Sequence, residues 1–163
     1  MNRTKAIFLF LALLLPVCIF VFLKIFGRNE FNVEPLFSEL PPPALSECQP
    51  ASAPYLLHDS VRSQLPYGND SLLVIAFEGN GDPNSVSQLR RLKEEIANLP
   101  VGFLTLPEGA RHLLWKRCLF FLQEPQDVVA VDLKGRIRGQ YTSTDREDID
   151  RLLTELTIIL KRY

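Results

Sequence analysis

The best-placed candidates for chemistry are four polar residues that follow the apolar run 71–77: Glu78, Asn80, Asp82 and Asn84. Turn residues bound that run, which predicts a strand buried on both faces. The loop then leads into a predicted helix over about 86–98. Redox or copper chemistry at such a junction would need thiols, because a soft Cu(I) centre prefers thiolate or thioether ligands. This loop supplies only amides and carboxylates.

The same residues have a structural interpretation. Asp82 followed by Pro83 is an N-cap followed by proline at the first helical position, and Ser85 with Gln88 forms a capping-box pattern one turn later. Glu78 and Asp82 could be an acid–base pair, but no histidine or metal ligand accompanies them. We therefore interpret them as solvated loop carboxylates and expect no catalytic residue, metal or cofactor in this degenerate loop.

Three cysteines and two histidines remain. Cys18 lies in an apolar segment, whereas Cys48 and Cys118 lie before and inside the predicted domain. In an oxidising compartment these two could form a disulfide. The alternative is two separate thiols, with Cys118 a small buried residue. A bridge requires Cα atoms within about 7 Å, which the sequence does not establish. His58 and His112 lack companions at metal-ligand spacing.

Charge argues against a nucleic-acid partner. The chain has 18 lysines and arginines against 19 aspartates and glutamates. Its basic residues are scattered instead of forming the patch that binds phosphates.

Residues 6–26 are apolar except for Lys24 and are long enough for a transmembrane helix. A cleaved signal peptide is disfavoured because no small-residue cleavage site follows, and a lipoprotein signal because the apolar run continues beyond Cys18. We therefore expect an uncleaved single-pass anchor. The basic residues of the stub 1–5 favour a cytoplasmic amino terminus, which would place residues 27–163 on the periplasmic side of a bacterial inner membrane.

Residues 27–54 are rich in proline, with three in succession from Pro41. Such composition predicts an extended, semi-rigid linker. A compact domain is expected over 55–163. Four apolar linker residues could pack on that domain or lie at the membrane interface: Phe31, Val33, Leu36 and Phe37.

Within the domain, a short strand at 55–59 precedes a strand–helix–strand–helix pattern, a hairpin and a final helix. The main strands are predicted at 71–77, 101–106, 128–132 and 136–141, and the helices at about 86–98, 110–116 and 144–160. A parallel strand pair needs a crossover helix, whereas an antiparallel pair needs only a turn. The predicted fold class is α/β, a thioredoxin-like mixed sheet with helices on both faces.

Parts of this sequence resemble the SCO/SenC family. The hairpin Val131-Asp-Leu-Lys-Gly-Arg-Ile-Arg-Gly-Gln-Tyr141 and the helix start Thr144-Asp-Arg-Glu-Asp-Ile-Asp-Arg-Leu-Leu153 are similar to the carboxy-terminal part of these proteins, and residues 20–29 resemble the anchors of bacterial members. The layout is similar over most of the chain. The resemblance implies a membrane-anchored, thioredoxin-like protein that helps assemble the copper site of cytochrome c oxidase.

The chain departs from that family at its functional residues. Active members bind copper through a Cys-x-x-x-Cys motif and a distant histidine, but residues 80–84 contain no cysteine and residues 119–131 no histidine. We therefore expect a non-catalytic, SCO-like binding or scaffolding factor in respiratory oxidase assembly, with oxidase subunits among its protein partners. One alternative is a thiol-redox or metal-chaperone protein that uses Cys48 and Cys118. Another is a structural envelope protein.

Overall fold

The computed structural model describes residues 3–26, 32–43, 47–68, 70–79 and 81–161, without the side chains of residues 4, 6–9, 26, 110 and 111. The chain divides into two compact units, residues 1–31 and residues 32–163.

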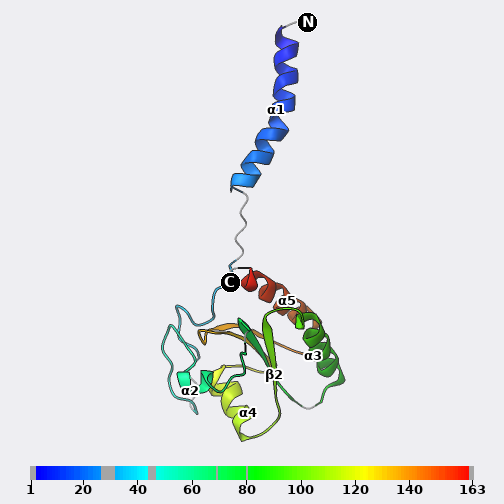
Figure 1. Cartoon of the computed structure of the whole chain (residues 1–163). Helices are drawn as coiled ribbons and strands as arrows, with labels where there is room; N and C mark the ends of the chain where they lie inside the picture. The colour runs from blue at the N-terminus through cyan, green and yellow to red at the C-terminus, as the bar shows by residue number, and fades with distance from the viewer. Residues whose placement is uncertain (1–2, 27–31, 44–46, 69, 80, 162–163) are drawn as a thin grey trace. The chain divides into compact units, whose positions relative to one another are not determined.

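The first unit contains helix α1 (Arg3–Phe26), which covers the apolar residues of the predicted anchor (Figure 1). Among the described residues, no helix is long and apolar enough to cross a membrane. This finding corrects the prediction of a transmembrane helix over 6–26, together with the inner-membrane, periplasmic-side localisation that depended on it.

The second unit is built on one mixed sheet with strand order β2-β1-β3-β4. β1 (Leu72–Phe77) lies parallel to β2 (Val101–Leu106) and antiparallel to β3 (Val128–Asp132), and β3 pairs antiparallel with β4 (Ile137–Tyr141). The predicted mixed α/β sheet is confirmed. All six residues of β1 are buried, as expected for a central strand covered on both faces.

Helices cover both faces of this sheet. On one face, α3 (Pro83–Ile96) and α5 (Arg146–Leu160) lie side by side (Figure 1). Leu92 and Leu152 pack there in one core cluster with Val74. The other face carries α2 (Asp59–Arg62), α4 (Ala110–Leu114) and the π-helical turn η1 (Trp115–Leu119). Its core cluster includes Trp115 and Ile75.

The predicted linker belongs to the compact second unit over its described residues 32–43 and 47–54. The Leu36 N–H donates to the Ile137 carbonyl of β4 (2.8 Å), and the buried Arg138 Nη2 donates to the Val33 carbonyl (2.6 Å). The segment therefore lies against the domain and is not a spacer. Phe31 falls outside the described residues.

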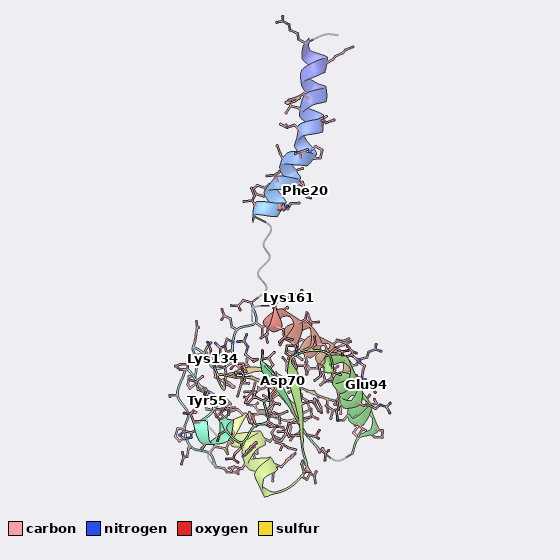
Figure 2. The ribbon with its side chains drawn as sticks, in the orientation of Figure 1. Phe20, Tyr55, Asp70, Glu94, Lys134 and Lys161 are labelled. Carbon is pink, nitrogen blue, oxygen red and sulfur yellow. A yellow bond between two sulfur atoms is a disulfide. The ribbon has the colours of Figure 1, made fainter. Side chains whose placement is uncertain are left out.

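The prediction of a short strand at 55–59 is wrong, because residues 55–58 belong to no strand and Asp59 begins α2. Hydrogen bonds hold residues 55–58 on the domain. The Leu57 N–H donates to the Gly135 carbonyl (2.9 Å). The hydroxyl of Tyr55, which is labelled in Figure 2, donates to the Leu119 carbonyl (2.9 Å). Gly135 has a φ of +77°, and a Cβ atom there would lie 3.3 Å from the Leu57 backbone. The hairpin turn therefore needs glycine both for its conformation and for this close approach.

The start of α5 differs slightly from its prediction. Asp145, and not Thr144, is the N-cap, because the Asp145 carboxylate accepts the Glu147 N–H (2.9 Å). Both residue types are favourable N-caps, so the sequence pattern leaves the choice open.

Candidate functional site

The loop after β1 is a capped entry into α3. Asp82 Oδ1 accepts the Asn84 N–H (2.8 Å), and Pro83 occupies the first turn. The helix therefore begins at Pro83 instead of about residue 86, and the predicted capping box of Ser85 and Gln88 lies inside it. The prediction that Asp82 caps the helix is confirmed.

Glu78 lies at the end of β1. Its N–H donates to the Leu106 carbonyl (2.9 Å), and the N–H of Phe77 just before it donates to the Asp127 carbonyl (2.8 Å). The backbone where the loop leaves the sheet is thus held on both sides, while the Glu78 side chain is exposed. Asn80, the other predicted loop residue, lies outside the described residues.

The first turn of α3 is tied to the segment after β4. The Asn84 Nδ2 donates to the Thr144 carbonyl (2.6 Å). The hydroxyls of Ser85 and Ser143 are hydrogen-bonded at 2.5 Å. Ser143 in turn donates its N–H (2.6 Å) and its hydroxyl to the Asp127 carboxylate. Side chains from three separate segments therefore form one hydrogen-bond chain, Ser85–Ser143–Asp127.

Two hydroxyls linked to a carboxylate, as in this Ser85–Ser143–Asp127 chain, could in principle relay a proton. Burial raises the pKa of Asp127, whereas the hydrogen bonds from Ser143 act in the opposite direction. Ser143 is completely buried and donates both of its groups to one carboxylate. A catalytic serine must reach substrate and a site that stabilises an oxyanion. We therefore interpret the chain as a structural connection between α3 and the sheet.

Asp127 and Ser143 are not among the site residues predicted from the sequence. Both are polar residues beside predicted strand ends, which is ordinary turn composition. Only the register of β3 and β4, with Val128 opposite Tyr141, brings them together. That register is the signal that could have revealed the pair.

His112 is buried on the sheet face that carries α4 and η1. Its ring meets the Phe77 ring edge to face, with the centroids 5.2 Å apart, and its Nε2 has no hydrogen-bond partner within the described structure. His58 caps α2 by accepting the Ser60 N–H (3.3 Å). In the part of the chain that the structure describes, no three His, Cys, Asp or Glu residues lie close enough together to hold a metal.

The structure joins Cys48 and Cys118 in a disulfide with Cα atoms 5.2 Å apart. The bond links the proline-rich segment to η1, across a sequence separation of 70 residues. Glu47 and Arg117, the residues before the two cysteines, form an exposed ion pair (3.4 Å). Of the two alternatives left by the sequence, the disulfide is the one present.

No protein-family model matches this chain, and no curated protein is significantly similar to it.

Proposed function

We propose that this chain is a non-catalytic binding or scaffolding protein that uses a thioredoxin-like, SCO-like framework to hold a protein partner. The observation that supports this most strongly is the use of the loop after β1. In this loop, Asp82 caps helix α3 by accepting the Asn84 N–H, and the hydroxyl of Ser85 is hydrogen-bonded to that of Ser143. Cys48 and Cys118 are already joined. At the expected reactive position, the side chains of Asp82, Asn84 and Ser85 therefore stabilise the fold.

The surface that supports binding lies at the carboxyl ends of β1 and β2. Because these strands are parallel, the helices that follow them begin at the same edge of the sheet, the usual place for ligands in α/β folds. Three large apolar side chains on these helices are exposed by 57–62%: Val86, Leu113 and Leu114. Exposed apolar side chains on these two helices favour a partner with an apolar anchor.

Charge around this surface favours a basic partner. Glu78, Asp82 and Glu108 are all exposed in the loops at this sheet edge. Complementary charge steers association and selects among partners more than it adds affinity. We infer a partner segment with apolar and basic residues. The SCO/SenC resemblance suggests subunits of a respiratory oxidase as its source.

Assays of copper binding and thiol exchange on the full-length chain test the non-catalytic part of the proposal. We expect no tight Cu(I) equivalent in a chelator-competition titration, because the described loop presents no thiol, and no catalysis of insulin reduction. A tight equivalent that survives mutation of Cys48 and Cys118 would overturn the assignment of the loop. Insulin turnover that disappears in the Cys118→Ser variant would instead support the thiol-redox alternative.

A further inference from the structure

β2 lies at the edge of the sheet, and its outer backbone groups have no hydrogen-bond partner among the residues that the structure describes. The register Leu72↔Val101 and the bond from Glu78 N–H to the Leu106 carbonyl (2.9 Å) mean that residues 102, 104 and 106 bond to β1. Backbone groups alternate in direction along a strand. The N–H and C=O groups of Phe103 and Thr105 therefore point away from the sheet, and no hydrogen bond among the described residues uses them.

This edge has none of the usual protection against pairing. Natural sheets shield their edges with charged side chains, prolines or bulges. β2 reads Val-Gly-Phe-Leu-Thr-Leu, with no charge and no proline. Phe103 and Thr105 are only partly buried. Such a row of backbone donors and acceptors can pair with another extended strand.

The ends of β2 show which strand fits best. The Val101 N–H already donates to the Leu99 carbonyl (2.8 Å), and Pro107 has no N–H. If two copies of β2 pair antiparallel about Leu104, each Val101 lies opposite the other copy's Pro107. The ladder then stops where both residues lack a free donor. Inside it, each Phe103 exchanges both backbone hydrogen bonds with the other copy's Thr105.

We propose that the free edge of β2 pairs with β2 of a second copy of this chain, antiparallel and centred on Leu104. The side chains suit this register, because Leu104 opposes Leu104 and Gly102 opposes Leu106, so apolar residues meet with no like charges in contact. The proposal is independent of the partner surface at the carboxyl ends of β1 and β2, since it concerns the side of β2 that faces away from β1.

Cysteine cross-linking of the full-length chain tests the register. In a Cys18→Ser background, Leu104→Cys places two thiols at the symmetry axis, where directly opposed Cβ atoms are about 4.5–5.5 Å apart. We expect a disulfide-linked dimer on a non-reducing gel. Thr105→Cys is the matched control, because it opposes Phe103 and not itself. Cross-linking of Leu104→Cys that is absent, or no stronger than that of Thr105→Cys, would overturn the proposal.

Sedimentation analysis of the full-length chain tests the backbone pairing. Thr105→Pro removes an outward N–H from both copies, and we expect self-association at least about tenfold weaker, whereas Thr105→Val, which keeps the N–H, leaves it unchanged. Equal association of the two variants would contradict the inference, as would a wild-type chain that stays monomeric at about 100 μM. Circular dichroism shows whether Thr105→Pro folds, and the cross-linking result decides if it does not.

Discussion

At the scale of single residues, the polar groups near the loop act through the helix start. Asp82 caps α3 by accepting the Asn84 N–H. Loss of an N-cap carboxylate costs about 0.5–2 kcal/mol. We predict that Asp82→Ala lowers the free energy of unfolding by about 1 kcal/mol, measured by urea titration.

Asp145→Ala is the matched control for that variant, because Asp145 caps α5 in the same way. The two losses should be similar. If Asp82→Ala leaves the free energy of unfolding unchanged while Asp145→Ala lowers it, Asp82 does not serve as the cap.

Asp127 predicts a specific pH dependence. Burial raises the pKa of this carboxyl above its ordinary value of 3.8, so the folded state binds the proton more tightly than the unfolded state. The contribution of Asp127 to stability is therefore present below pH 3.8 and is lost as the pH rises from there through the raised pKa. The Asp127→Asn variant should not show this loss of stability as the pH rises.

Urea unfolding at a series of pH values from about 3 to 7 measures this effect. The exposed Glu108 provides the control substitution Glu108→Gln, which should keep the wild-type profile. An Asp127→Asn profile parallel to that of the wild-type chain would show that Asp127 does not contribute in this way.

At the scale of elements, the sequence predicts strands better than helix starts or packed loops. The bounds of β2 and β3 agree with the predicted ranges 101–106 and 128–132, because each is an apolar run between turn residues. The start of α3 was misplaced, because several residues in succession could cap it. Composition predicts the local stiffness of a proline-rich segment but not its contacts, so packing of Val33 and Leu36 on the domain was only one of two alternatives; the structure shows it, on β4.

The same limit explains what was missed in the candidate site. The loop residue Asp82 was predicted because capping is a local pattern. The contact of Ser143 with Asp127 depends on strand register, and the burial of His112 beside Phe77 depends on packing between α4 and β1. Neither arises from neighbours in the sequence.

The disulfide should contribute much of the stability of the second unit. Cys48 and Cys118 are separated by 70 residues, and the chain-entropy model assigns a loop of this length about 4 kcal/mol. That is a large share of a typical stability of about 5–15 kcal/mol. We predict that Cys118→Ser lowers the free energy of unfolding by about 2–4 kcal/mol in urea titration.

Cys18→Ser is the control for this prediction, because Cys18 is a free cysteine and its loss should change little. A reducing agent should destabilise the wild-type chain as much as the Cys118→Ser substitution does. Unchanged stability in both tests would mean that the bond does not constrain the unfolded chain.

At the scale of the whole molecule, the second unit offers two different edges for association. The outer edge of β2 is suited to a second copy, through the backbone groups of Phe103 and Thr105. At the carboxyl ends of β1 and β2, helix α4 carries the exposed Leu113 and Leu114, and the loops carry the exposed Glu78 and Glu108. The central claim is that the surface at the carboxyl ends of β1 and β2 binds a protein partner and catalyses no reaction.

Co-purification from native cells, quantified by mass spectrometry, tests that claim most directly. The full-length wild-type chain is compared with the double variant Leu113→Glu and Leu114→Glu and with Leu133→Glu, a control in the hairpin turn at an exposed leucine (48%). We predict a discrete partner that the wild type and Leu133→Glu retain equally and that the double variant loses by at least about tenfold. Equal recovery of the same proteins by all three chains would contradict the account.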